Sequence, residues 1–244
     1  MIRSIGSYVL FLGHTMSGIQ KGRFLYESFK LECVKVGTDS VYVVSVVAIL
    51  TGGVSLVQTT FALSAPYIED YIIGMVVRDT TFALIPTLIA LVFSGKVGSG
   101  MSGELGSMRI SEQIDALEVM GINAASFLVL PKLLASIIML PILICISAFL
   151  SLASGYLLAY LGGFISGDSY VYGIRYDFKE INLVIIFTKA FLHGFIVSSI
   201  SSYQGFHTRG GALDVGKSNT RSIVLCSVMI LVTDFLVTRI FGSF

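Results

Sequence analysis

Charged residues are scarce in this chain of 244 residues: they make up 13% of it, while hydrophobic residues make up 55%. A soluble globular protein carries about 25% charged residues, so the chain has roughly half of the charge that a water-facing surface needs. A basic excess is lacking too, because 16 Lys and Arg residues stand against 15 Asp and Glu residues. These shortages exclude a soluble enzyme, a disordered chain and a nucleic-acid-binding protein. They indicate an integral membrane protein.

Cysteine is scarce as well, and Cys33, Cys145 and Cys226 are scattered without a CxxC motif or a histidine cluster. This spacing predicts neither a disulfide framework nor a zinc site. We expect the three thiols to pack as small apolar residues, and we expect no metal and no cofactor.

Long runs without charge predict membrane-spanning helices, because a span needs about 18 or more apolar residues. The uncharged run 133–167 is too short for two spans and a turn, so we expect one long span, kinked at Pro141. The predicted fold is an all-α integral membrane protein with five transmembrane helices in a membrane domain over 39–244. The five expected spans are about 41–64, 74–95, 127–160, 181–205 and 222–241.

Residues 1–38 mix aromatic and basic side chains, which favours an interfacial helix on the membrane surface. The distribution of Lys and Arg then fixes the orientation, because cytoplasmic loops carry the excess. With the N-terminus inside, most of these cations are cytoplasmic. The four on the outer side are Arg78, Arg175, Lys179 and Arg239. The sequence therefore predicts a cytoplasmic N-terminus and a periplasmic C-terminus.

The longest inner loop carries an amphipathic pattern over about 104–120. At about 100° per residue, its four carboxylates fall within one arc of roughly 120° and its apolar residues within another. The carboxylates are those of Glu104, Glu112, Asp115 and Glu118. Such a helix either rests on the protein's own membrane domain or docks into a groove on a soluble partner.

Ionisable groups inside a bilayer are costly and mark functional sites. Lys189 and Asp234 lie in different expected spans and could meet at one interface, either as an ion pair that joins two helices or as a contact for a lipid headgroup. His193 follows Lys189 by one helical turn. Arg78 and Asp79, near the outer surface, either snorkel to it or contact an anionic lipid or a periplasmic partner.

Two glycine-rich patterns resemble nucleotide-binding motifs. Residues 98–103 spell GSGMSG, and residues 211–218 spell GALDVGKS. Both motifs need a strand before them and a helix after them to cradle phosphate, and here a membrane span enters each. We therefore expect flexible cytoplasmic turns and no nucleotide site.

Three segments together resemble one known family. They are GKVGSGMSGELGSMRISEQIDALEVMG (95–121), YQGFHTRGGALDVGKSNTR (203–221) and DFLVT (234–238). They are similar to the signature of the MlaE (YrbE) permeases of MCE-type lipid ABC transporters, and the resemblance covers roughly residues 35–241.

The resemblance implies a transport subunit that is not itself an enzyme. It implies a homodimer bound to a separate ABC ATPase, with the helix over 104–120 as a coupling helix in the ATPase cleft. The coupling residues would then be Glu104, Arg109, Glu112, Asp115 and Glu118.

The implied task is to move phospholipid between the inner membrane and a periplasmic MCE-domain protein, which maintains outer-membrane lipid asymmetry. The resemblance also leaves room for a small cytosolic regulatory subunit. Gln58 and Lys189 match positions that the family fills in the same way. Many members place an Arg-Glu pair where this chain has Phe82 and Ala83, and Arg78 with Asp79, one helical turn earlier, would substitute for it.

Two other functions compete with this one. A proton-coupled secondary transporter would use Lys189, His193 and Asp234 as a relay, but such folds usually show inverted repeats, and the sequence shows no convincing one. A membrane scaffold that only anchors partners would not need buried charges.

Overall fold

The computed structural model describes residues 2–17, 22–63 and 69–241, and within these ranges it contains helices and short connections but no strand. Parts of two predictions lie outside the described residues: residues 1 and 18–21 of the interfacial segment, and residue 64 of the first span. The helices are α1 (Ile2–Ser17), α2 (Gly22–Cys33), η1 (Val34–Thr38), α3 (Asp39–Ala62), α4 (Asp70–Phe93), η2 (Ser94–Gly98), α5 (Ser99–Ile110), α6 (Gln113–Val119), α7 (Ala124–Gly162), α8 (Gly167–Arg175), α9 (Ile181–Phe206) and α10 (Ala212–Phe241).

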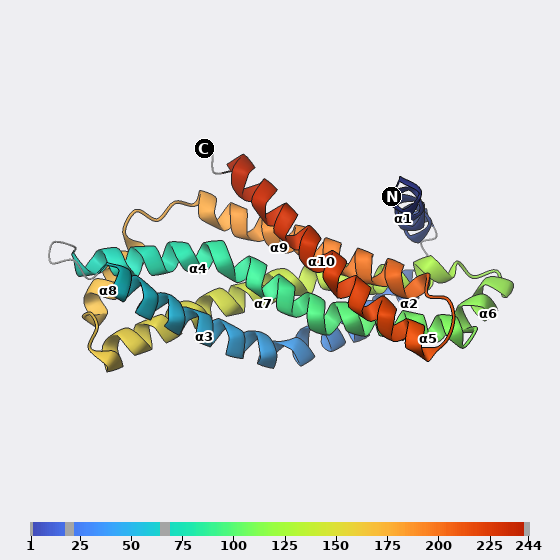
Figure 1. Ribbon diagram of the computed structural model, residues 1–244, viewed down its shortest axis with the longest axis horizontal. Coiled ribbons are helices and arrows are strands. Elements are labelled where there is room, and N and C mark those ends of the chain that lie inside the picture. The colour runs from blue at the N-terminus through green and yellow to red at the C-terminus, as the bar shows by residue number, and fades with distance from the viewer. Residues whose placement is uncertain (1, 18–21, 64–68, 242–244) are drawn as a thin grey trace.

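Five helical segments are long and apolar enough to cross a membrane, which confirms the predicted fold class. They are Leu25–Ala62, Asp70–Ile110, Ala124–Gly162, Ile181–Phe206 and Ala212–Phe241. They run along one long axis as a bundle (Figure 1). The third span is a single helix that runs through Pro131 and Pro141.

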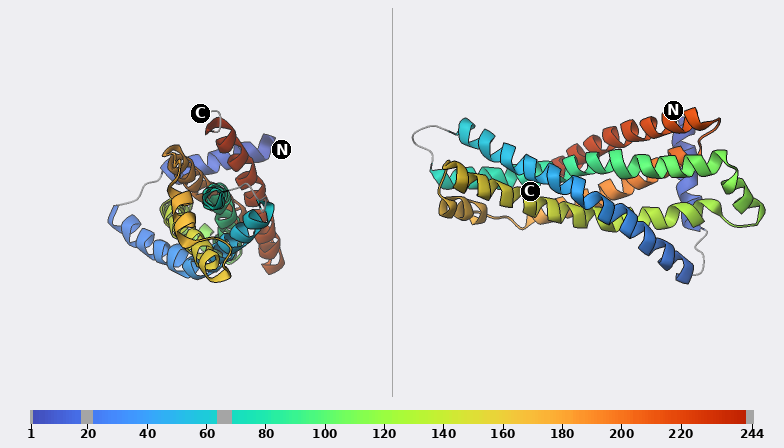
Figure 2. Two further views of the ribbon diagram at one scale, coloured as in Figure 1. Left: turned by 90° about the vertical axis from the view of Figure 1, so that its left-hand side faces the viewer. Right: turned by 90° about the horizontal axis from the view of Figure 1, so that it is seen from below.

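The two ends of the bundle differ. The short helix α8 covers one end, while α5 and α6 project at the other, and α1 lies across the bundle beside that second end (Figures 1 and 2). The connections between successive spans therefore alternate between the two ends, as five spans require.

Each of the first two spans consists of two α-helices that are joined by a turn of π-helix. Helices α2 and α3 are joined by η1, and α4 and α5 by η2. The N-terminal segment thus differs from the single surface helix that we expected: it forms α1, which lies across the bundle, and α2, which is continuous with the first span. The two π turns are neighbours, because Lys96 Nζ in η2 donates to the backbone carbonyl of Asp39, just after η1.

The core has a central cluster and a smaller one at the α8 end. Phe93, Ile144 and Ile230 are fully buried in the central cluster, which joins the middle parts of the spans. Tyr170 of α8 is fully buried in the second cluster, where its hydroxyl donates to the carbonyl of Leu152 at 3.2 Å. Burial of these side chains against several spans makes one body of α8 and the bundle.

Helices α3 and α7 approach closely at a glycine. A Cβ atom at Gly52 would overlap the backbone carbonyl oxygen of Ser151, and backbone cannot move aside as a flexible side chain can. Small residues permit this kind of backbone contact between membrane helices.

We expect Gly52→Ala to destabilise the protein by about 1–3 kcal/mol, the usual cost of overpacking. The measurement is thermal unfolding in mild detergent. Gly100→Ala is the matched control, because a Cβ there meets no atom within 4 Å and alanine favours the helix by up to about 1 kcal/mol. Equal melting temperatures for the two variants would contradict the close approach.

The last span, α10, is the least covered. Only 17% of its most apolar stretch is buried, against 39–50% for the other four spans. Its exposed side chains are large and apolar, among them Leu231, Phe235 and Leu236. Such a surface requires lipid or a protein partner.

Candidate functional site

An ion pair inside the membrane joins α9 to α10. Lys189 Nζ lies 2.8 Å from Asp234 Oδ1, and the Lys189 side chain is only 3% exposed. Thr87 of α4 donates its hydroxyl proton to the same carboxylate oxygen at 2.6 Å. The structure thus brings together the two residues that the sequence placed in different spans, and it adds Thr87, which only a three-dimensional arrangement could reveal.

His193 lies next to this pair but is not hydrogen-bonded to it. The ring is fully buried, and within the described residues neither ring nitrogen has a hydrogen-bond partner. It packs between helices, one turn beyond Lys189.

Arg78 is buried, although it lies in the N-terminal half of α4. Its guanidinium donates to the backbone carbonyls of Ile174 at 3.0 Å and Tyr176 at 2.6 Å, and it pairs with Asp79 at 2.9 Å. Its side chain is 3% exposed, while that of Asp79 is 50% exposed. Arg78 therefore anchors the connection between α8 and α9, and Asp79 presents the more accessible side of the pair.

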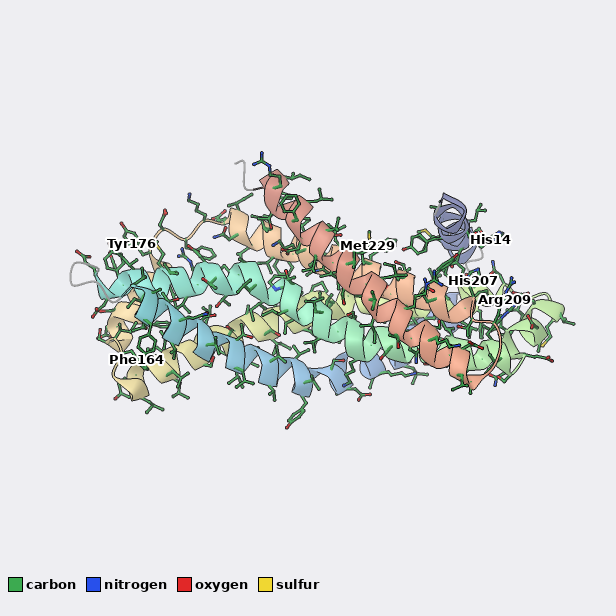
Figure 3. The ribbon with its side chains drawn as sticks, viewed as in Figure 1. His14, Phe164, Tyr176, His207, Arg209 and Met229 are labelled. Atoms are coloured by element: carbon green, nitrogen blue, oxygen red, sulfur yellow. The ribbon has the colours of Figure 1, made fainter. Side chains whose placement is uncertain are left out.

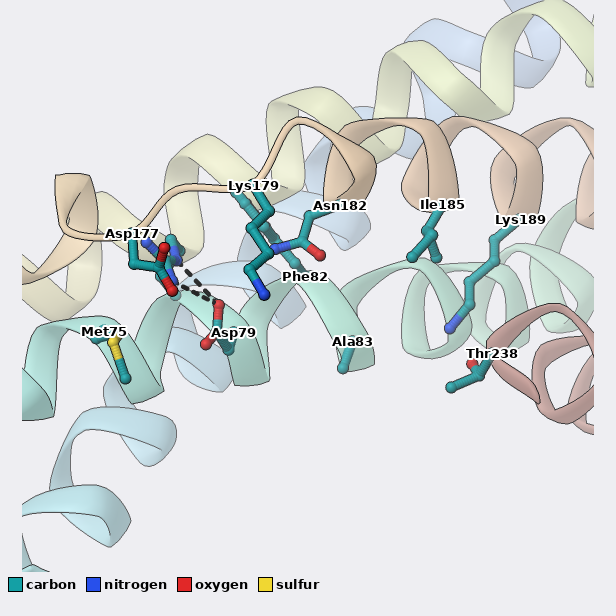
Figure 4. Close-up of a pocket in the computed structure, with 11 residues that line it drawn as sticks. Met75, Asp79, Phe82, Ala83, Asp177, Lys179, Asn182, Ile185, Lys189 and Thr238 are labelled. Atoms are coloured by element: carbon teal, nitrogen blue, oxygen red, sulfur yellow. Dashed lines mark hydrogen bonds and ion pairs between the residues drawn. The ribbon is translucent and has the colours of Figure 1, made fainter. Parts of the chain in front are cut away.

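A cavity of about 330 Å³ opens between α4, α9, α10 and the connection before α9. Arg78, Asp79 and Lys189 line it together (Figure 4). Asp177 and Lys179 line it as well, although the sequence did not predict them as site residues. We call this cavity the polar pocket.

Gln58 lies elsewhere. It is exposed in an apolar groove of about 630 Å³ between α3 and α7, with Leu50, Val54 and Leu157 among its neighbours. The structure therefore does not place Gln58 in the polar pocket with Lys189. A groove of this shape suits an acyl chain or an apolar helix.

The segment that we expected to form one helix over 104–120 is broken, which corrects that prediction. Helix α5 ends at Ile110, Glu112 adopts a left-handed conformation with φ of 58°, and α6 begins at Gln113. Because the arc of four carboxylates assumed an unbroken helix, it does not exist. Glu112 and Glu118 are exposed, whereas Asp115 pairs with Arg109 at 2.6 Å across the break.

Glu104 faces the bundle and not the tip of this segment. Lys132 Nζ of α7 lies 3.1 Å from Glu104 Oε1 and 2.6 Å from Glu32 Oε1 of α2, and Lys35 pairs with Glu104 as well. We call Glu32, Lys35, Glu104 and Lys132 the ion cluster. A single lysine inside the apolar start of α7 was the one sequence feature that could have predicted it.

The tip of the segment is apolar as well as acidic. Val119 and Met120 are 89% and 73% exposed, while Ile114 is fully buried and holds α6 against the bundle. Exposed apolar side chains beside Glu112 and Glu118 make a compact surface suited to a partner protein.

Helix α1 packs on the end of α9 through aromatic rings. Phe11 lies 5.6 Å from Tyr203 and 5.4 Å from His207, measured between ring centroids. His207 and Arg209 lie beside α1 at this end of the bundle (Figure 3). Burial lowers the pKa of His207, and nearby Arg109 and Arg209 lower it further, so we expect a neutral ring at pH 7.

The two glycine-rich patterns lie largely in helices. Residues 98–103 belong to η2 and α5, and α10 begins at Ala212, inside the second pattern. Lys217 is paired with Asp214 at 2.9 Å. A phosphate-binding loop needs free backbone N–H groups. In the second pattern the N–H of Gly211 donates to Asp214 Oδ2, and those of Asp214 and Val215 donate to the carbonyl of Gly211.

The family model "Permease MlaE" matches residues 29–240 of the chain. A "Probable ABC transporter permease protein" of Rickettsia bellii is 30% identical over 99% of this chain and 93% of the relative. A protein with the same description from Synechocystis is 27% identical over 93% of this chain and 86% of the relative. The chloroplast protein TRIGALACTOSYLDIACYLGLYCEROL 1 of Arabidopsis thaliana is 27% identical over 96% of this chain and 67% of the relative. The chain therefore belongs to the MlaE family of ABC transporter permeases.

Proposed function

We propose that this permease moves phospholipid between the inner membrane and a periplasmic MCE-domain protein, and so helps to maintain the lipid asymmetry of the outer membrane. The observation that carries the proposal is the polar pocket, which offers cations and carboxylates inside an otherwise apolar bundle. A phospholipid has matching parts, because its headgroup needs polar contacts and its acyl chains need apolar walls. The Arabidopsis relative is named after a galactosylated diacylglycerol, which is a lipid, and this supports a lipid as cargo.

The membrane orientation follows from charge. The bundle end with α5 and α6 holds Lys96, Arg109, Lys132, Arg209 and Lys217, and the positive-inside rule assigns this end to the cytoplasm. The polar pocket and α8 then face the periplasm, next to an MCE-domain partner. The N-terminus is cytoplasmic and the C-terminus periplasmic.

The uncovered face of α10 supports a homodimer. An apolar span whose most apolar stretch is only 17% buried gains van der Waals contacts when it packs against a second copy, because helices in lipid associate through close packing. Thr238 of α10 lines the polar pocket, so the dimer would enclose that edge of the pocket.

Lipid transport is tested by purifying the complex in mild detergent and identifying what accompanies it by mass spectrometry. An ATPase subunit and bound phospholipid are expected, and a small cytosolic subunit would accompany them. ATP-dependent transfer of labelled phospholipid to vesicles is the functional readout. A lone protein that takes up solute in exchange for protons would replace this proposal with the secondary transporter.

The tip of α6 is the proposed contact for the ATPase. We expect the double variant Glu112→Lys with Glu118→Lys to lower the affinity for the ATPase at least tenfold. Repulsion between like charges, or the loss of an ion pair, at an interface costs more than about 1.4 kcal/mol. Both carboxylates are exposed, so the melting temperature of the permease should stay the same.

Co-purification of the ATPase with the variant permease measures this effect. Asp168→Lys is the matched control, because Asp168 is an exposed carboxylate in α8 at the opposite end of the bundle. If the ATPase remains bound to the double variant, α6 is not part of the interface with the ATPase.

A further inference from the structure

The polar pocket contains more charge than its own ion pairs use. Arg78 is neutralised by Asp79, and Lys189 by Asp234. Two lining residues remain, Asp177 and Lys179, and within the described part of the chain neither side chain has an ion pair or a hydrogen bond. Both residues are exposed to solvent, so the pocket presents one accessible carboxylate and one accessible ammonium group.

The backbone that carries these two charges is fixed. Arg78 donates to the carbonyls of Ile174 and Tyr176, directly before Asp177. The ring of Phe178, between the two charged residues, packs on Phe82 at 6.1 Å and under the Arg78 guanidinium at 5.8 Å. These contacts hold the backbone at Ile174, Tyr176 and Phe178, and a preorganised backbone favours binding.

Asp177 has an unusual backbone conformation. Its φ is 47°, in the left-handed region, which few residues other than glycine adopt and in which Asp and Asn are enriched. Asp177 and Lys179 both line the pocket, while Phe178 between them packs on Phe82 and Arg78, which line it too. Lys179 points into the pocket toward α4, on the same side as Lys189 (Figure 4).

We propose that the polar pocket selects a zwitterionic phospholipid headgroup, with Lys179 binding the phosphate and Asp177 binding a primary ammonium group such as that of ethanolamine. This inference rests on the proposed lipid-transport function and names the substrate class of that site. One cation and one anion match a headgroup that carries both charges. An anionic headgroup such as glycerol phosphate would satisfy Lys179 and leave Asp177 without a partner.

The volume is consistent with this occupant. About 330 Å³ lies at the small end of ligand pockets, which span roughly 300–1,000 Å³, and so accommodates a headgroup without its acyl chains. The Asn182 amide also lines the pocket and offers both donor and acceptor to the phosphate and ammonium groups. The acyl chains would remain outside, against the apolar surface of the spans.

The test uses the complete permease complex in detergent, incubated with equimolar phosphatidylethanolamine and phosphatidylglycerol. Native mass spectrometry then counts each bound lipid. We expect the wild-type complex to bind phosphatidylethanolamine in roughly tenfold excess, the effect of one charge-assisted hydrogen bond. In Asp177→Asn the two lipids should bind about equally, since asparagine tolerates the left-handed conformation but lacks the charge.

Lys179→Gln should weaken both lipids by roughly tenfold and leave their ratio as in the wild type. Glu180→Gln and Arg175→Gln are matched controls, because both residues are exposed near the same loop but do not line the pocket. They should behave as the wild type.

The failures are distinguishable. If the wild type binds both lipids equally, or if Asp177→Asn keeps the excess, the headgroup assignment is overturned while lipid transport stands. If no phospholipid binds and none is transferred to vesicles, the proposed function itself is overturned.

Discussion

Replacing Asp234 by alanine is expected to lower the stability of the permease by about 3–5 kcal/mol, the cost of leaving a buried charge without its partner. Lys189 is 3% exposed and pairs with this carboxylate at 2.8 Å, so the ammonium group would remain inside the bundle uncompensated. The hydroxyl of Thr87 would lose its acceptor as well. Thermal unfolding in detergent measures the loss, and phospholipid transfer should fall at least tenfold.

The double variant Lys189→Met with Asp234→Leu separates structure from function. Apolar replacement of both partners of a buried pair is often neutral or stabilising, so the melting temperature should return to near the wild-type value. Transfer of phospholipid should remain low, because the polar pocket has lost Lys189. A double variant that is both stable and fully active would show that the pair only holds α9 to α10.

Lys132→Met is expected to have the second-largest effect, because it removes the centre of the ion cluster. Lys132 is 4% exposed and contacts Glu32 and Glu104, which are 16% and 34% exposed. Partial exposure of both carboxylates reduces the penalty, so we expect a stability loss on the order of 2 kcal/mol.

The functional loss should be larger than the stability loss suggests. The ion cluster fixes α5 relative to α2 and α7, and α5 carries α6 to the proposed ATPase contact. ATP hydrolysis by the complex should continue while phospholipid transfer falls about tenfold. Lys30→Met is the control, because Lys30 is exposed on α2 and contacts only the ring of Tyr26 among the described residues. If ATP hydrolysis and phospholipid transfer fall equally, the ion cluster contributes only to the stability of the fold.

The spans were predictable because their signal is local. Uncharged runs of adequate length have one stable form in a bilayer, in which every backbone group is satisfied within the helix. The meeting of Lys189 with Asp234 was predictable for a related reason, since two opposite charges inside apolar helices are stable only as partners. Both inferences need no knowledge of how distant segments pack.

The inner loop could not be predicted in the same way. Counting 100° per residue over 104–120 assumes an unbroken helix, and the left-handed residue Glu112 breaks it. No residue between Arg109 and Gln113 excludes a helix by its own propensity, so the break depends on tertiary packing, as the burial of Ile114 indicates. The contacts of Arg78 with the carbonyls of Ile174 and Tyr176 are long-range too, and no local pattern announces them.

The π turns η1 and η2 rotate one part of each long helix relative to the other part: α2 relative to α3, and α4 relative to α5. A π turn holds one residue more than an α-turn, and each added residue rotates everything beyond it by about 100° around the helix axis. Each π turn therefore changes which side chains share one face of the helix before and after it. Because η1 and η2 are tied together through Lys96 and Asp39, the first two spans change phase at one common level. The residues that form one face of the helix before the π turn are thus offset by about 100° from those that form the same face after it.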